Sequence, residues 1–159
     1  MGFRHSEYER LESDTYITPK WVWDILYDHF ERFRDAYECC PANAQFDFCD
    51  DTIIRKYVAT NPPYGRQAER IARHALHVTE LAEGSVALLL PHAWDTAKLR
   101  TGIFGYPFHA KLVITERIHW ANLEIKRDKR GNIIRPASTH AWYIWDWSRR
   151  HSMPIMLWS

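Results

Sequence analysis

The residues with the clearest capacity for chemistry are four in a row, Asn61-Pro62-Pro63-Tyr64, which follow a strand-like run at 57–60 and precede a helical pattern. The Asn61 side-chain oxygen and the Pro62 carbonyl can each accept one N–H hydrogen bond from a planar amine. Two acceptors placed off the ring plane favour a more pyramidal nitrogen and aim its lone pair at an incoming methyl group. We therefore interpret this turn as suited to methyl transfer onto a planar exocyclic nitrogen.

The residue types on either side of Asn61 fit the same hypothesis. Prolines lack an N–H donor and have a fixed φ, so Pro62 and Pro63 make the turn stiff and leave its carbonyls available to accept. The Tyr64 ring can stack on the face of a base. A plain strand-to-helix turn is the alternative, because Asn-Pro and Pro-Pro are common turn signals. By residue usage, about one chain of this length in a thousand or fewer contains this tetrapeptide by chance, which favours function.

Hydrophobic periodicity predicts strands that alternate with helices. The expected helical segments are 18–33, 66–83 and 94–101, and the expected strands are 36–40, 57–60, 86–90, 110–115, 141–147 and 153–158, the last as an edge strand or a tail. This alternation is typical of an α/β fold with a doubly wound, mostly parallel sheet. Ligands on such sheets bind at the carboxyl ends of strands, so the turns after Cys40 and Thr60 are expected to face one crevice.

The order of short motifs resembles the compact DNA N6-adenine methyltransferases of bacteriophages and prophages, from about Thr15 to Trp147. The Leu-Pro to Asp-Thr segment and the turn at Asn61 are the more specific of these motifs. The segments that carry the resemblance are Tyr16-Ile17-Thr18-Pro19-Lys20 before Trp21 and Leu26, Glu38 to Ala44, Asp50-Asp51-Thr52, Asn61 to Gly65, and Leu88-Leu89-Leu90-Pro91 with Trp94-Asp95-Thr96.

This resemblance implies an abbreviated Rossmann-like methyltransferase fold, a mostly parallel sheet with flanking helices. It implies S-adenosylmethionine as cofactor, adenine in DNA as substrate, and Asn61, Pro62, Pro63 and Tyr64 as the catalytic residues. A phage or prophage origin would place the protein in the cytoplasm of a bacterial host cell. The residues that the resemblance assigns to the cofactor are Tyr16, Thr18, Pro19, Glu38, Cys39, Asp50 and Asp51.

The cofactor turn departs from the wider methyltransferase pattern, because Pro41-Ala42-Asn43-Ala44 contains no glycine. Glycine would let the backbone approach the methionine part of the cofactor closely. Too few residues separate Glu38 from Asp50 for the second and third strands that normally cradle the adenosine. The adenosine pocket could be shallow, completed by a partner subunit, or lost, which leaves a homo-oligomer open. Glu38 could equally be a solvated strand-end carboxylate, and Asp50 could cap a turn.

The expected DNA-binding element is a basic hairpin near 122–136, with a Gly-Asn turn at its tip. Its cations, Lys126, Arg127, Lys129 and Arg130, could clamp phosphates. A solvated hairpin is the alternative. Trp120 and Asn122 precede the hairpin and could lie near the base or the displaced strand. An adenine within a duplex must be flipped out before its N6 can be reached.

Composition fits one small domain at 16–159, preceded by a flexible arm at 1–15, in a chain of 159 residues with a formal net charge of +1. Attraction to DNA must therefore come from local basic segments. No apolar run has membrane-spanning length. The cysteines, Cys39, Cys40 and Cys49, are expected to be reduced in an intracellular protein. His74 and His77 lack a ligand cluster at metal spacing, so no metal site is expected.

Three hypotheses from different classes follow. The first is DNA adenine-N6 methylation. The second is methyl transfer to another planar nitrogen, in RNA adenine or protein glutamine, for which the same turn would serve. The third is a non-catalytic protein with a methyltransferase-like fold that binds DNA or a partner. Cofactor binding separates the third hypothesis from the others, and a substrate panel separates the first from the second.

Overall fold

The computed structural model describes residues 16–41, 47–105, 107–134, 136–149 and 152–159. The expected arm at 1–15 lies outside these residues. Among the described residues, no helix is long and apolar enough to cross a membrane. The helices and strands are α1 (Lys20–His29), β1 (Tyr57–Thr60), α2 (Arg66–Glu80), β2 (Ser85–Pro91), β3 (Phe108–Val113), β4 (His140–Asp146) and β5 (Ile155–Trp158).

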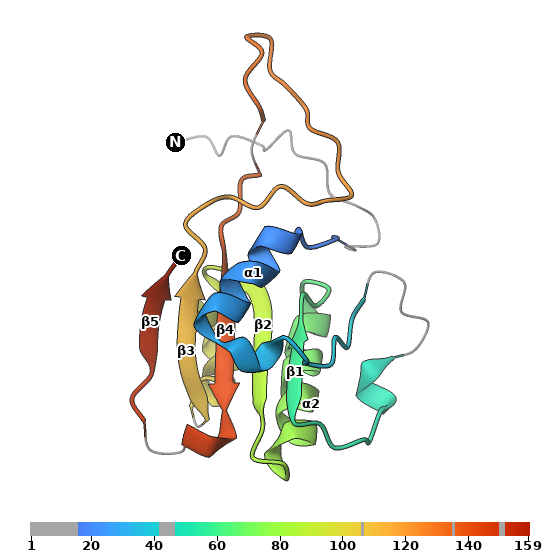
Figure 1. The fold of residues 1–159 in the computed structure, drawn as a ribbon, viewed down its shortest axis with the longest axis vertical. Coiled ribbons are helices and arrows are strands. Elements are labelled where there is room, and N and C mark those ends of the chain that lie inside the picture. The colour runs from blue at the N-terminus through green and yellow to red at the C-terminus, as the bar shows by residue number, and fades with distance from the viewer. Residues whose placement is uncertain (1–15, 42–46, 106, 135, 150–151) are drawn as a thin grey trace.

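The α/β class is confirmed, and the sheet is mixed, with strand order β1-β2-β4-β3-β5 (Figure 1). β1 pairs with β2 in parallel and β3 pairs with β5 in parallel. β4 lies between β2 and β3 and runs antiparallel to both. Because β4 alone is reversed, the carboxyl ends of β1, β2 and β3 and the amino end of β4 lie at the same end of the sheet.

The predicted strand at 36–40 is wrong as a continuous element. Only Tyr37 pairs there, through an isolated parallel bridge to Val58. Its amide donates to the Tyr57 carbonyl at 2.9 Å, and its carbonyl accepts from the Ala59 amide at 3.1 Å. The chain bends at Cys39 and Cys40 before Pro41, whose nitrogen has no hydrogen to extend a ladder.

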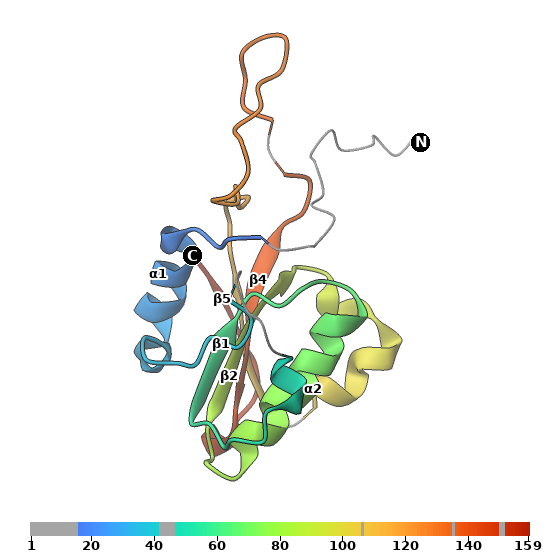
Figure 2. The same cartoon turned by 90° about the vertical axis from the view of Figure 1, so that its right-hand side faces the viewer.

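Helices cover both faces of the sheet, so the protein has three layers (Figure 2). Val86, Leu88 and Leu90 of β2 pack in the same core as α2, whereas Ala87 and Leu89 pack in the core of α1. Burial on both faces explains why β2 is a continuous apolar run without polar alternation.

The predicted helix boundaries run too long at their ends. The first helix ends at His29, where Phe30 leaves helical geometry with φ −141° and ψ 73°, and a 3-10 turn follows at Glu31–Phe33. The second helix ends at Glu80, and the chain then turns through Gly84. A Cβ at Gly84 would meet the Lys56 carbonyl oxygen, so only glycine allows this close passage.

The shorter predicted elements are also resolved. The segment expected to be helical near 94–101 forms two 3-10 turns, Trp94–Thr96 and Lys98–Ile103. β5 is confirmed as an edge strand of the sheet.

The predicted hairpin is present and projects beyond the edge of the sheet at which β1 ends (Figures 1 and 2). Its two limbs meet in an antiparallel bridge between Arg127 and Ile133. The Asp128 carboxylate accepts the backbone N–H groups of Arg130 and Asn132 at 2.8 and 2.9 Å and so closes the turn. The turn is thus found at the predicted place, and among the described residues its limbs pair through one isolated bridge and not as two strands.

Candidate functional site

Asn61 follows β1 directly and has one satisfied and one unsatisfied side-chain group. Its Nδ2 donates to the Tyr16 carbonyl at 3.2 Å. A carbonyl only accepts, so this bond fixes which way the amide faces. The Asn61 Oδ1 is then buried without a hydrogen-bond partner among the described residues. An unsatisfied buried acceptor costs about 1–3 kcal/mol, so this oxygen would gain from a hydrogen-bond donor placed beside it.

Asn61 borders a small pocket at the carboxyl end of β1. The pocket has a volume of about 160 Å³. Its lining residues come from the segment before and within α1 and from the segment after Tyr37, and they are Tyr16, Ile17, Thr18, Trp23, Glu38, Cys40, Pro41 and Asn61. The structure therefore brings the predicted cofactor residues Tyr16, Thr18 and Glu38 together with Asn61. Pro19 adjoins this lining as the residue that caps the amino end of α1.

Glu38 contributes a carboxylate to this pocket. Although the residue as a whole is exposed, the protein atoms around its carboxyl group raise its pKa by desolvation. No lysine, arginine or histidine lies among the described lining residues of the pocket. The pocket therefore offers acceptors and aromatic rings, which suit a ligand that carries amino groups or a positive charge.

Cys39 and Cys40 point into different environments. Cys39 is 1% exposed and packs in the core beneath α2, whereas Cys40 lines the pocket. Their sulfur atoms lie 3.7 Å apart without a disulfide. The hydrogen bond from Cys39 lowers the pKa of the Cys40 thiol and raises that of Cys39. Of the two, Cys40 is thus the thiol at the pocket, which the sequence motif did not single out.

Asp50 and Asp51 lie apart from the pocket, on the side of the sheet covered by α2. Asp51 forms an ion pair with Arg55 at 2.8 Å, and this hydrogen bond lowers the pKa of its carboxyl group. Asp50 is mostly exposed and lies 3.9 Å from Arg70. The structure does not bring these two carboxylates to the residues around Asn61, because a 3-10 turn at Phe48–Asp50 carries them against α2.

Tyr64 belongs to a cluster of aromatic rings at the end of the sheet where β1 ends and β4 begins. Its ring lies 5.8 Å from that of Tyr16 and 5.9 Å from that of His140, which is stacked at 29°. Trp120 completes the cluster, 5.2 Å from Tyr16 and 5.1 Å from His140. Trp120 is 2% exposed, so this ring, predicted to contact DNA, instead supports the rings beside it.

His140 is a further site residue that sequence reasoning missed. It is 1% exposed, and its Nε2 lies 3.0 Å from the Tyr64 hydroxyl. Burial lowers the pKa of His140 to about 4, so the ring is neutral at neutral pH. No motif marks a histidine at the start of an apolar strand, and only the pairing of β4 with β2 brings it opposite the turn.

The hairpin is joined to the pocket segment through its base. The Asn122 side-chain oxygen accepts the Ile17 amide, and the Ala121 amide donates to the Ile17 carbonyl, both at 2.9 Å. At the tip, Lys129 and Arg130 are exposed, while Arg127 donates to the Gly131 carbonyl at 2.8 Å. Lys126 is exposed on the first limb. Asn122 thus has a positioning role in this structure, and the exposed cations lie beyond it.

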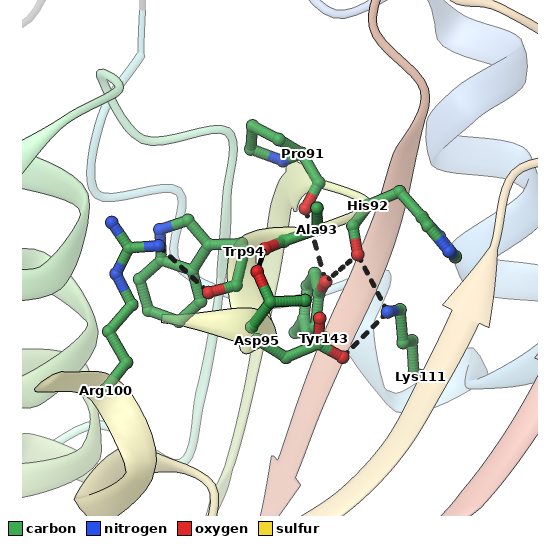
Figure 3. A network of polar contacts seen from close by, with 9 residues as sticks. Pro91, His92, Ala93, Trp94, Asp95, Arg100, Lys111 and Tyr143 are labelled. Carbon is green, nitrogen blue, oxygen red and sulfur yellow. Dashed lines mark hydrogen bonds and ion pairs between the residues drawn. The ribbon is translucent and has the colours of Figure 1, made fainter. Parts of the chain in front are cut away.

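The segment after β2 is held by a partly buried polar network (Figure 3). The Lys111 ammonium contacts the Asp95 carboxylate at 2.7 Å and the His92 carbonyl at 2.8 Å. The Tyr143 hydroxyl donates to the same carbonyl at 2.7 Å, and burial raises its pKa. In this structure the Leu-Pro to Asp-Thr motif has a structural role, because Asp95 holds the loop that leaves the sheet beside β4.

No protein-family model matches this chain, and no curated protein matches it either. Function is therefore inferred from the geometry around Asn61 and from the chemistry of the residues beside it.

Proposed function

We propose that this protein transfers a methyl group from S-adenosylmethionine to the N6 amino group of adenine in DNA. The observation that carries the proposal is the buried Asn61 Oδ1, which has no partner among the described residues. It stands in a Pro-Pro turn at the carboxyl end of β1 and borders a pocket. An amino group that donates to this oxygen would satisfy it.

The turn would orient the adenine amino group by accepting its two N–H hydrogen bonds. The Asn61 Oδ1 would accept one N–H of the adenine amino group, and the Pro62 carbonyl would accept the other. Nδ2 of Asn61 is held by the Tyr16 carbonyl, so the acceptor is fixed before the base arrives. Preorganised contacts of this kind need no rearrangement when the amine becomes more pyramidal.

The ring cluster would hold the base. The Tyr64 ring contacts the rings of Tyr16 and His140, and the hydroxyl contact with His140 fixes its orientation. A flipped base loses its stacking in the duplex and needs an aromatic surface in return. The neutral state of His140 avoids a buried positive charge beside an incoming cationic methyl donor.

The pocket chemistry fits part of the proposed cofactor. Glu38 would suit an amino or hydroxyl group, and the rings of Tyr16 and Trp23 would suit the positive charge. When bound, S-adenosylmethionine would supply an electrophilic methyl group and leave as a neutral thioether, while the methylated nitrogen would release one proton to solvent. The volume of about 160 Å³ is below the several hundred Å³ of most ligand pockets, so the described lining holds only one end of this cofactor.

The arrangement of the strands and the hairpin also supports the proposal. The Tyr37 bridge, β1 and β2 lie side by side in parallel, as neighbouring strands of an abbreviated Rossmann-like sheet would. The hairpin leaves the edge of the sheet that carries Asn61 (Figure 1). DNA held by Lys129 and Arg130 would therefore approach the pocket from this edge.

The small pocket favours a second candidate, a DNA-binding protein of this fold without cofactor. Calorimetric titration with S-adenosylmethionine separates the two, because only the methyltransferase binds it.

A panel with labelled methyl donor then tests the substrate. We expect incorporation into adenine-containing DNA, and incorporation only into RNA or a glutamine peptide would contradict the proposal. Asn61→Ala should abolish transfer. Asn61→Asp keeps an acceptor oxygen but loses the positioning bond from Nδ2 to the Tyr16 carbonyl, so it should retain only part of the activity.

A further inference from the structure

A second and larger groove lies at the base of the hairpin. It has a volume of about 380 Å³ and shares no lining residue with the pocket beside Asn61. Figure 1 shows the segment between β3 and β4 passing over the amino end of α1. Trp21 lies in the first turn of this helix, which begins at Lys20. The groove is lined by Trp21 from α1 and, from the hairpin and its base, by Glu116, Arg117, His119, Ile125, Ile133 and Pro136.

Its lining combines exposed apolar surface with polar edges. Trp21 is 36% exposed, Ile125 58% and Ile133 45%, so three large apolar side chains meet solvent in one groove. Glu116 can accept hydrogen bonds at the rim, and Arg117 can donate them. Arg117 is held in place by a bond from its Nη1 to the Pro136 carbonyl at 3.1 Å. A flat ring with polar groups on its edge matches this arrangement.

Charge narrows the choice of ligand. Arg127, Lys129 and Arg130 are exposed farther along the same hairpin, beyond the residues that line the groove. The one carboxylate at the tip, that of Asp128, already accepts the amides of Arg130 and Asn132. Proteins bind single-stranded nucleic acid by combining exposed aromatic rings, which stack on bases, with nearby cations, which contact phosphates. The groove supplies the ring of Trp21, and the hairpin that lines it carries the cations.

We infer that this groove binds an unpaired nucleotide, whose base stacks on Trp21 between Ile125 and Ile133 while the flanking phosphates contact Lys129 and Arg130. The inference rests on the proposed function for its nucleic-acid partner and adds a second base-binding site, separate from the adenine site. A paired base cannot present its face to a side chain, so the groove selects single-stranded or locally opened DNA.

Fluorescence anisotropy with a short, labelled single-stranded DNA tests this inference directly. Trp21→Ala should weaken binding about fivefold to hundredfold, the value of one base–aromatic stack, and should leave the salt dependence unchanged because the cations that bind phosphate are all still present. Trp21→Phe should retain most of the affinity. Trp158→Ala is the matched control for the loss of an exposed tryptophan, since Trp158 lies on the edge strand β5 and does not line the groove.

Two further arms keep the outcome decisive. Ile125→Ser changes an exposed position, so it should not impair folding, and it should weaken single-strand binding severalfold. Both Trp21→Ala and Ile125→Ser should change duplex binding less. Wild-type affinity for Trp21→Ala, an equal loss on duplex, or no binding of DNA by the wild-type protein would overturn the inference.

The methyl-transfer readout separates this inference from the proposed function. Trp21-dependent binding without any methyl transfer would contradict the proposed function and still support nucleotide binding in the groove. If the wild-type protein transfers methyl groups and the Trp21→Ala variant binds DNA normally, only the inference about the groove would be contradicted.

Discussion

The Tyr64 hydroxyl lies 3.0 Å from Nε2 of the buried His140, so the aromatic residue of the turn is joined to the first residue of β4. This contact links the Pro-Pro turn to a strand far away in sequence. It also gives the hydroxyl a structural partner that the sequence did not indicate. The ring and the hydroxyl of Tyr64 therefore have separable roles.

Substitutions at Tyr64 should separate these roles. Tyr64→Phe leaves Nε2 of His140 buried without its partner, so we expect a loss of about 1–3 kcal/mol in the free energy of unfolding with most activity retained. Tyr64→Ala also removes the stacking surface, and activity should fall about tenfold to a hundredfold. Denaturant unfolding and methyl-transfer rates measure the two effects. A folded Tyr64→Phe protein as inactive as Tyr64→Ala would show that the hydroxyl takes part in the chemistry.

Acidification should destabilise the protein through His140. Its pKa is about 4 in the folded protein and about 6.5 in an unfolded chain. Between these values the unfolded state binds the proton and the folded state does not. The contribution to stability is therefore complete above about pH 6.5 and lost as the pH falls towards 4, by about 3 kcal/mol.

Unfolding free energies at pH 7 and pH 4.5 check this expectation. His109, whose pKa is also lowered by burial, contributes in the same direction, so the comparison uses the difference between proteins. His140→Gln should show a shallower pH dependence than the wild type. His77→Gln, at an exposed position on α2, should not change the slope. An unaltered slope for His140→Gln would contradict the assignment.

Sequence patterns predicted the elements whose structure depends only on residues close together in the chain. The Pro-Pro turn, the β2 run and the hairpin each have a pattern complete within a few residues. The Tyr37 segment failed as a strand because its pairing depends on a single bridge to Val58, which periodicity does not reveal. His140 was missed because only the antiparallel insertion of β4 brings it to Tyr64.

Burial also changed the interpretation of two residues. Trp120 is an aromatic ahead of a basic hairpin, a pattern that suits a base contact, but tertiary packing encloses it. Lys111 lies within an apolar strand and pairs with Asp95 across the sheet edge. Both outcomes depend on long-range contacts, which single-sequence patterns do not contain.

The Lys111–Asp95 pair should be important for stability. Lys111→Met leaves the Asp95 carboxylate without its cation, and we expect a loss of about 3 kcal/mol in the free energy of unfolding, near the lower end for a buried pair because Asp95 keeps some solvent contact. Adding Asp95→Asn should recover most of that loss. Lys20→Met, which breaks the exposed pair with Asp24, is the control and should cost less than about 1 kcal/mol. Equal losses for both lysines would refute a special role for the network.

The hairpin cations should govern the salt dependence of DNA binding. Neutral replacements at Lys126, Arg127, Lys129 and Arg130 should weaken binding and flatten the plot of log affinity against log salt, by about one unit for each phosphate that the variant no longer binds. Replacing Lys98 and Arg73, exposed on the α2 side of the sheet, is the control for the loss of two of these four charges. An unchanged slope in the hairpin variant would mean that the hairpin is only a solvated loop.

The most direct test of the central claim is mass-spectrometric detection of N6-methyladenine in DNA incubated with the protein and S-adenosylmethionine. We expect N6-methyladenine with the wild-type protein and a loss of about a hundredfold or more with a folded Asn61→Ala variant, because the preorganised acceptor is gone. Full activity in that variant, or no methylated adenine from a folded wild-type protein on any adenine-containing DNA, would contradict the proposed function.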